Sequence, residues 1–211
     1  MPGSKIGPIV GVILAGGRAE RMGGGDKGLR EVGGKAILAR VIERVRPQVD
    51  DLVLNATGDP ARFEAYGLPV VPDSVPNFAG PLAGILAGLD WAAGHQPQAR
   101  YVVTVPADGP FVPRDLVLRL ADALTSDDSE VVTAASGVQT YPVIGLWPVS
   151  SRQALRDALV KEDLRKVDAW TKRFRRAIAS FSAEPIDPFF NANTPEQLAE
   201  AERLAALHPD I

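Results

Sequence analysis

Cysteine is absent from this 211-residue chain, and histidine occurs only at His95 and His208. Without cysteine there can be no disulfide, no thiolate zinc site and no cysteine nucleophile. Two isolated histidines also argue against a histidine-rich metal centre and against a serine–histidine–aspartate triad. This composition favours chemistry that needs neither a thiolate nor an imidazole.

Long apolar segments and a strong net charge are missing as well. No apolar run approaches the ~20 residues of a membrane-spanning helix, and residues 1–6 lack the apolar core of a signal peptide. The net charge of −3 provides no overall field that would recruit nucleic acid or an anionic membrane. We therefore expect a cytoplasmic protein that binds neither nucleic acid nor membranes, and any attraction for phosphate must be local.

The composition is otherwise that of an ordinary folded domain, with 45% hydrophobic and 23% charged residues. A chain of 211 residues is long enough for one α/β domain with a sizeable core. No internal repeat, low-complexity tract or obvious linker divides it. We interpret residues 1–211 as a single domain with two functional halves, about 8–110 and about 111–211.

Strand-like and helix-like segments alternate through the first half, which favours parallel βαβ units in an open sheet. The second half instead contains two strand-like runs around Ser136-Gly137, which predict a hairpin, and then two helices, one strand and a last helix. The expected fold class is α/β: a three-layer, Rossmann-like, mostly parallel open sheet with helices on both faces and a mixed-sheet second half. Strands are predicted at 9–14, 51–55, 68–72, 101–105, 130–134, 139–147 and 177–181. The main helices are predicted at 36–46, from the loop 78–84 to about residue 93, and at 114–124, 151–160 and 164–174. A turn is expected at Gly33-Gly34, and a short helix with Asp59 as its N-cap and Pro60 at its first position.

The densest motif is a glycine-rich, basic loop that directly follows the first predicted strand. Glycines let a backbone approach a ligand closely, so that its N–H groups can point at an anion, and cations would neutralise that anion. The loop is therefore a candidate phosphate site, although a solvated surface loop is the alternative. Its members are Gly16, Gly17, Gly23, Gly24, Gly25, Arg18, Arg21 and Lys27.

Two familiar nucleotide motifs do not explain this loop. Residues 23–28 formally match G-x-G-x-x-G, but the strand ends nine residues earlier and the next helix begins only at about Ala36. Neither Lys27 nor Lys35 is followed by Ser or Thr as a Walker motif requires. The loop is thus interpreted as a phosphate binder of a third kind.

Polar residues stand at three predicted strand ends: Asn55, Asp73 and Asp108. Because the carboxyl ends of the strands form the ligand crevice of an open α/β sheet, these side chains should converge on the loop. Each could equally be an ordinary turn residue or cap. Asp108 is the strongest candidate, since a carboxylate after a buried strand suits Mg²⁺ together with phosphate oxygens and water. Lys27 and Arg21 would complete the charge balance.

The second half of the chain contributes further candidate site residues, which are asparagines and basic side chains. Thr194 is expected to cap the last helix, with Pro195 at its first position and Gln197 closing a capping box, which leaves Asn191 or Asn193 spare for another task. A polar loop is the alternative for these asparagines. The second half also contains several basic residues, which could bind an anionic second substrate or simply form a solvated helix face. They are Arg165, Lys166, Arg173, Arg175 and Arg176.

Taken together, these segments carry a resemblance. Leu14-Ala15-Gly16-Gly17, Arg21-Met22-Gly23 and Asp26-Lys27 resemble the signature loop of nucleotidyltransferases with a nucleotide-diphospho-sugar-transferase-like fold. With the segments 80–84 (GPLAG), 106–110 (PADGP) and 191–195 (NANTP), the chain resembles the molybdenum cofactor guanylyltransferase (MobA) family from about Val10 to the final helix.

The resemblance implies transfer of GMP from GTP to molybdenum-bearing molybdopterin, with release of pyrophosphate and formation of a guanine dinucleotide cofactor. It implies GTP contacts at Leu14 to Gly17, with Lys27 on the phosphates, and Mg²⁺ at Asp108. It places Asn55 and Asp73 on the nucleoside side, and Gly80 and Gly84 would let the backbone approach the guanine. Asn191 and Asn193 would lie near the reacting phosphates, on the acceptor side of the site. A short match at Arg165-Lys166-Val167 suggests a pterin side.

The chemistry agrees with the composition, because the attacking phosphate oxygen of the pterin is already ionised and needs no histidine or cysteine base. Catalysis would depend on positioning and charge stabilisation. The alternatives are a cytidylyltransferase acting on molybdopterin or on a sugar or alditol phosphate, and a non-catalytic nucleotide- or cofactor-binding protein of the same fold. Gly16 favours GTP, because cytidylyl relatives more often resemble Leu-Ala-Ala-Gly. Transient contacts with proteins that supply or accept the cofactor are also expected.

Overall fold

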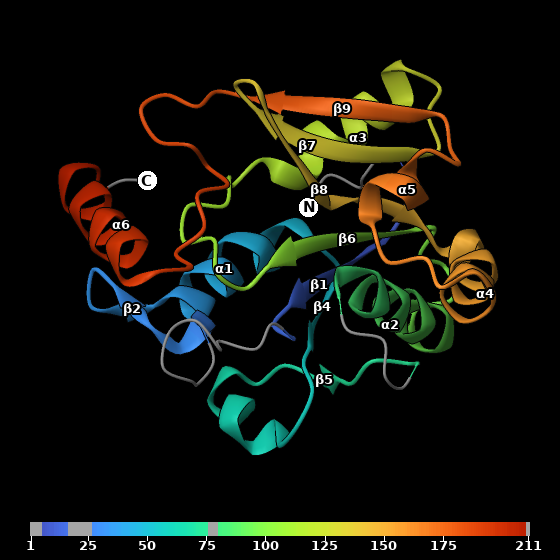
Figure 1. The fold of residues 1–211 in the computed structure, drawn as a ribbon, viewed down its shortest axis with the longest axis horizontal. Helices are drawn as coiled ribbons and strands as arrows, with labels where there is room; N and C mark the ends of the chain where they lie inside the picture. The colour runs from blue at the N-terminus through green and yellow to red at the C-terminus, as the bar shows by residue number, and fades with distance from the viewer. Residues whose placement is uncertain (1–5, 17–26, 76–79, 210–211) are drawn as a thin grey trace.

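The computed structural model describes residues 6–16, 27–75 and 80–209. At its centre is a seven-stranded sheet in the order β5-β4-β1-β6-β8-β7-β9, in which only β8 runs against the other strands (Figure 1). The mostly parallel α/β sheet expected from the sequence is confirmed. The strands are β1 (Ile9–Leu14), β4 (Asp51–Asn55), β5 (Val70–Val71), β6 (Tyr101–Pro106), β7 (Val131–Ser136), β8 (Gln139–Pro148) and β9 (Arg176–Phe181).

The strand order reverses next to β1. From β1 the chain moves outward to β4 and then β5, and it returns to place β6 on the opposite side of β1. Such a reversal splays the loops at the carboxyl ends of the two neighbouring strands and opens a crevice there. The glycine-rich loop follows β1, and the turn that carries Asp108 follows β6, so both motifs leave the sheet at this point.

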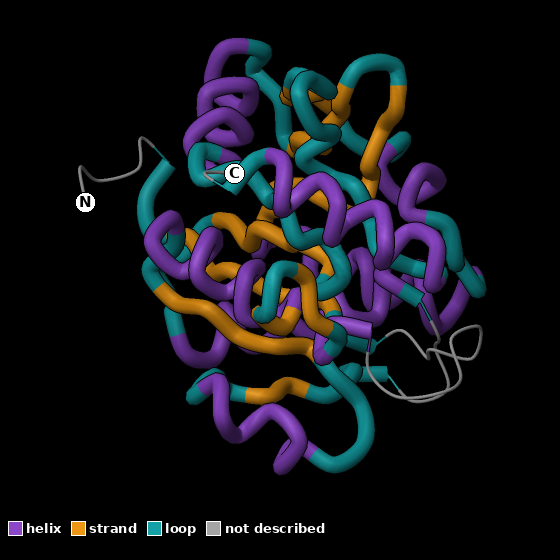
Figure 2. Tube along the Cα trace, turned by 90° about the vertical axis from the view of Figure 1, so that its left-hand side faces the viewer, coloured by secondary structure: helices purple, strands orange, loops and turns teal. Residues whose placement is uncertain are grey.

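Helices cover both faces of the sheet (Figure 2). Along β1, Ile9 and Ile13 face one core whereas Val10 and Val12 face the other, because successive side chains of a strand point to opposite sides. The first core includes side chains from α1 (Ile37–Val45), α3 (Leu116–Ser126) and α6 (Pro195–Leu207). The second includes side chains from α2 (Pro81–His95), α4 (Arg152–Glu162) and α5 (Val167–Thr171).

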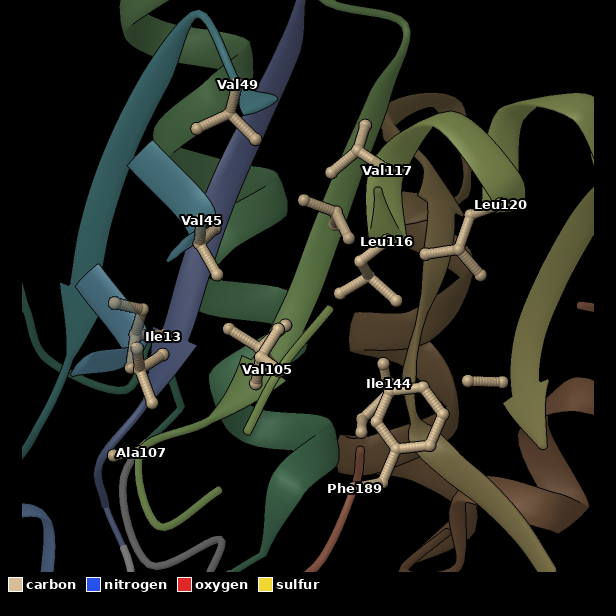
Figure 3. Packing of buried hydrophobic residues seen from close by; sticks show 14 of the residues in the cluster. Ile13, Val45, Val49, Val105, Ala107, Leu116, Val117, Leu120, Ile144 and Phe189 are labelled. Carbon is tan, nitrogen blue, oxygen red and sulfur yellow. The ribbon is translucent and has the colours of Figure 1, made fainter. Parts of the chain in front are cut away.

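The first core joins the two halves of the chain. Figure 3 shows Ile13 of β1 and Val105 of β6 in the same cluster as Leu116 of α3 and Phe189 of the C-terminal segment. Ile144 of β8, which is 2% exposed, belongs to the same cluster. The segment that follows β9 therefore packs on the same core as β1 and β6.

Several predicted local features are confirmed. Asp59 caps the short helix η4 (Pro60–Tyr66) by accepting a hydrogen bond from the N–H of Ala61 at 2.9 Å. The hairpin between β7 and β8 turns at Gly137, which has a φ of +54°. Among the described helices, none has the length and apolarity that a bilayer crossing requires.

Other local features differ from expectation or were not predicted. Gly33 and Gly34, with φ of +61° and +69°, form the turn of a small hairpin between β2 (Glu31–Val32) and β3 (Lys35–Ala36), where only a turn was expected. The helix predicted at 164–174 is limited to α5. Short 3₁₀ segments complete the structure: η2 (Lys27–Leu29), η3 (Arg46–Gln48) and η5 (Val149–Ser151).

Candidate functional site

The carboxyl ends of β4, β1 and β6 are joined by main-chain hydrogen bonds. The N–H of Ala15 donates to the carbonyl of Asn55 at 2.8 Å, and the N–H of Ala107 donates to the carbonyl of Leu14 at 3.0 Å. The loop after β1, the end of β4 and the turn after β6 therefore start from the same edge of the sheet. Leu14, Asn55 and Asp108, which the sequence placed at strand ends, are brought together there.

Asn55 has a fixed carboxamide orientation. It is 3% exposed, and its Nδ2 donates to the carbonyl of Val71 at 3.1 Å and to Oδ1 of Asp73 at 2.9 Å. Since both amide hydrogens are used, the oxygen must face the other way, towards Gly16 and Gly84. The pair Asn55–Asp73 thus presents a hydrogen-bond acceptor at the start of the glycine-rich loop.

The helix α2 lies unusually close to this edge because glycine recurs every four residues. A Cβ on Gly84 would lie 2.3 Å from Asn55 Oδ1 and 2.7 Å from a methyl carbon of Leu14. A Cβ on Gly88 would lie 2.4 Å from a methyl carbon of Val12. Gly80, the N-cap, has a φ of +130°, which favours glycine. Asn55 and Leu14 occupy the space that the missing side chain of Gly84 leaves. The predicted approach of a guanine to Gly80 and Gly84 stays a prediction.

The turn that carries Asp108 is held by neighbours from separate parts of the chain. The carbonyl of Asp108 accepts a hydrogen bond from the N–H of Ala192 at 3.1 Å. A Cβ on Gly28 would lie 3.1 Å from the carbonyl oxygen of Ala107, so η2 lies directly against the turn. The backbone of residue 27 is therefore adjacent to the Asp108 turn. Gly17, Arg18 and Arg21, and the side chain of Lys27, lie outside the described part of the chain.

The segment 187–193 brings the asparagines of the second half to the same turn. Asn191 Oδ1 is buried, has no hydrogen-bond partner among the described residues, and lies 3.6 Å from where a Cβ of Gly109 would be. The N–H of Asn193 donates to Gln197 Oε1 at 2.9 Å. Thr194 caps α6 as predicted, by accepting from the N–H of Gln197 at 3.2 Å. The predicted capping box is wrong in one detail: Gln197 reaches the N–H of Asn193, not that of Thr194.

Two residues that sequence reasoning missed anchor this segment. The hydroxyl of Tyr141 donates to Asp187 Oδ2, and Asp187 Oδ1 accepts from the N–H of Phe189 at 3.0 Å. The Phe189 ring packs against Tyr141 and Phe181, with ring centroids 5.1 and 5.0 Å apart. Burial, together with the hydrogen bond to Asp187, raises the pKa of Tyr141 well above its ordinary value. The adjacent phenylalanines at 189 and 190 were the sequence signal that this loop is packed.

The basic residues of the second half do not share this edge as a group. Arg176 is the first residue of β9, which is parallel to β7, so it lies at the amino-terminal edge of the sheet, opposite Asp108. Arg173 forms a two-point ion pair with Glu162 nearby in the chain, which raises the pKa of Arg173. Arg165 pairs with Asp163 at 2.5 Å in the connection between α4 and α5. A role for Arg165 on the acceptor side stays a prediction.

Known proteins resemble this chain over nearly its full length. The model of the MobA-like NTP transferase domain matches residues 11–177. A molybdenum cofactor guanylyltransferase of Bradyrhizobium sp. (strain ORS 278) is 59% identical, and the alignment covers 98% of both chains. The protein of the same name from Mesorhizobium japonicum is 46% identical over 93% of this chain and 95% of its own.

Solved structures share the fold. The molybdopterin-guanine dinucleotide biosynthesis protein A of Archaeoglobus fulgidus superposes with a TM-score of 0.71, at 22% identity, over 94% of this chain and 99% of its own. A CMP:2-keto-3-deoxy-manno-octonic acid synthetase complexed with CTP also reaches 0.71, at 13% identity, over 95% of this chain and 98% of its own. The fold is therefore common to enzymes that use different nucleotides, whereas the family match is specific. The chain belongs to the MobA-like NTP transferases and, among these nucleotidyltransferases, to the molybdenum cofactor guanylyltransferases.

Proposed function

We propose that the protein transfers GMP from GTP to molybdenum-bearing molybdopterin, forming the guanine dinucleotide cofactor and releasing pyrophosphate. The observation that carries this proposal is the 59% identity, over 98% of both chains, to a molybdenum cofactor guanylyltransferase. The main-chain bonds that join the ends of β4, β1 and β6 support it, because they gather the candidate nucleotide residues at the reversal of strand order.

The nucleotide would lie along the edge formed by these strands. Leu14, Ala15, Gly16 and Gly17 would contact GTP through the backbone, and Lys27 and Arg21 would neutralise its phosphates. Asn55 would accept a hydrogen bond from the nucleoside with the oxygen that Asp73 and Val71 leave available. Asn191 and Asn193 would lie near the reacting phosphates on the acceptor side, and Arg165 would also serve the acceptor.

A divalent cation fits the oxygen groups at the Asp108 turn. Within residues 6–16, 27–75 and 80–209, no three acidic, histidine or cysteine side chains come together as a complete metal site. Mg²⁺ does not require one, since it commonly takes one or two carboxylates plus phosphate oxygens and water. Asp108 would hold the ion, beside the buried, unsatisfied Asn191 oxygen. When bound, the ion would neutralise charge on the phosphates of GTP.

The bond changes need no general base from the chain. A phosphate oxygen of molybdopterin, already ionised at neutral pH, would attack the α-phosphorus of GTP, and the bond from that phosphorus to the pyrophosphate oxygen would break. The protein would contribute orientation of the two substrates and cationic groups around the phosphates. This agrees with a chain that has no cysteine and only two histidines.

A substrate panel tests the proposal. The protein would be incubated with Mg²⁺, molybdenum-bearing molybdopterin and each of the four nucleoside triphosphates, and pyrophosphate release would be measured. Of the four nucleoside triphosphates, we expect only GTP to give pyrophosphate release in this mixture. Turnover with CTP in place of GTP would support the cytidylyl alternative, and tight GTP binding without turnover would support a non-catalytic role; either result would reject the proposal. A cytoplasmic location and transient contacts with cofactor-handling proteins stay predictions.

A further inference from the structure

A buried arginine at the end of α1 binds the chain just beyond the Asp108 turn. Arg44 is only 7% exposed, and it forms no ion pair within the described ranges. Its Nη1 donates to the carbonyl of Val112 at 3.1 Å. Burial lowers the pKa of Arg44, with help from the nearby cations Arg114 and Arg40, but an arginine stays charged in a protein. Burying a cation is costly unless it is hydrogen-bonded, and among the described residues the carbonyl of Val112 is the acceptor that Arg44 uses.

Gln48 extends the same attachment. Its Nε2 donates to the carbonyl of Arg44 at 2.7 Å and to that of Pro113 at 2.8 Å. Its Oε1 accepts from the N–H of Val117, in the first turn of α3, at 2.9 Å. All the polar groups of the Gln48 carboxamide are therefore committed to the residues around it. Together, Arg44 and Gln48 fix the backbone at Val112, Pro113 and Val117.

This segment packs next to Gly109, the residue that follows Asp108. The Val112 side chain is 1% exposed, and one of its methyl carbons lies 3.8 Å from where a Cβ of Gly109 would be. Gly109 follows Asp108, whose carbonyl is tied on the other side to the N–H of Ala192. Val112 therefore supports one side of the turn that carries Asp108, and Ala192 holds the other side.

We propose that Arg44 and Gln48 are positioning residues for Asp108: they touch neither substrate, and they hold the turn so that its carboxylate is ready for a divalent cation. The inference rests on the proposed role of Asp108 in metal binding. Groups that orient a metal ligand affect metal affinity when they are removed, even though they do not contact the metal.

The test measures metal binding itself. Free Mn²⁺ would be followed by electron paramagnetic resonance in titrations of the protein with GTP and without acceptor, for the wild type and for Gln48→Leu. The matched control is Gln96→Leu, because Gln96 Nε2 donates to Asp51 Oδ2 at 2.9 Å, in the first residue of β4, whereas Gln48 bonds to the segment that leads to the Asp108 turn. We expect roughly tenfold weaker Mn²⁺ binding for Gln48→Leu, at the lower end of the range for groups behind a metal ligand. Its turnover should recover in excess metal, while the control behaves as the wild type.

Two further variants keep the outcomes distinct. Arg44→Lys retains a donor near Val112 and should weaken Mn²⁺ binding less than Gln48→Leu does. If Gln48→Leu does not fold, Arg44→Lys becomes the test variant. It must then bind Mn²⁺ more weakly than the control. Asp108→Ala should lose the tight site. If Asp108→Ala binds Mn²⁺ like the wild type, the metal assignment itself is wrong. If Asp108→Ala loses the site but the folded test variant matches the control within about twofold, the positioning inference alone is overturned.

Discussion

At the scale of single residues, the site depends on what Asn55 can offer. Both hydrogens of its amide are bound by Val71 and Asp73, so only its oxygen remains for a ligand. The sequence could place Asn55 and Asp108 at strand ends, because each follows a β-branched or apolar run and precedes a turn. It could not reveal that Gly84, 29 positions later, makes the room in which the Asn55 carboxamide sits. Such contacts depend on how closely a helix packs on a sheet.

Gly84→Ala should weaken GTP binding. The added methyl would lie 2.3 Å from Asn55 Oδ1 and 2.7 Å from Leu14, so the Asn55 carboxamide has to move or α2 has to shift. Overpacking of this kind costs roughly 1–3 kcal/mol of stability. We expect the KM for GTP to rise by about tenfold, equivalent to ~1.4 kcal/mol, with a smaller change in kcat. Steady-state kinetics with varied GTP would measure this.

Gly94→Ala is the matched control, because Gly94 belongs to the same helix and a Cβ there would meet nothing within 4 Å. Replacing an exposed helical glycine with alanine should stabilise the fold by about 0.5–1 kcal/mol and leave the KM for GTP unchanged. An unchanged KM in both variants would show that the Asn55 carboxamide does not contact the nucleotide.

At the scale of elements, the segment 187–193 and helix α6 form one unit. The start of α6 was predictable, because Thr194, Pro195 and Gln197 follow known rules for the first turn of a helix. The path of the preceding segment was not, since it depends on Tyr141 and Asp187, which are 46 positions apart. The small hairpin at Gly33 was also missed; its amide binds Glu202 of α6 at 2.8 Å, a partner 169 positions away.

Thr194→Ala should loosen this unit. The Thr194 hydroxyl oxygen accepts from the N–H of Gln197, and loss of such a cap costs about 1 kcal/mol. Asn193 and Asn191 lie one and three residues before the cap, on the proposed acceptor side. We therefore also expect a higher KM for molybdopterin and little change in the KM for GTP. Chemical denaturation and kinetics with each substrate varied would measure the two effects.

Thr125→Ala serves as the comparison for that variant. The Thr125 hydroxyl bonds back to the carbonyls of Ala121 and Asp122 within α3, and its removal should change stability by less than about 0.5 kcal/mol. Equal losses in the two variants would contradict a capping role for Thr194.

At the scale of the whole molecule, Tyr141 links β8 to the C-terminal segment. This link should make the free energy of unfolding depend on pH in the alkaline range. Its pKa in the folded protein lies above the unfolded value of about 10. The protonated phenol therefore contributes its full stabilisation below about pH 10, and the contribution is lost as the pH rises through the folded pKa. We expect Tyr141→Phe to be less stable than the wild type at pH 8, and the difference to narrow between about pH 10 and 11.

Urea denaturation of both proteins across that range measures the difference. Other groups titrate in the same range, but they are common to both proteins and cancel in the comparison. A difference in unfolding free energy that stays constant from pH 8 to pH 11 would show that the Tyr141 hydroxyl titrates normally in the fold.

Strand order is the other whole-molecule property, and the patterns in the sequence did not predict it. The hairpin of β7 and β8 was predicted from the residues around Gly137, but nothing in that pattern shows that β8 enters between β6 and β7. The insertion also bears on protein synthesis. Until residue 148 has emerged from the ribosome, residues 101–104 of β6 lack the strand that pairs with them on one side, and their main chain is an open template for other strands. A product truncated after α3 would therefore contain the candidate nucleotide residues of β1, β4 and β6 but leave one edge of β6 unpaired and prone to aggregation.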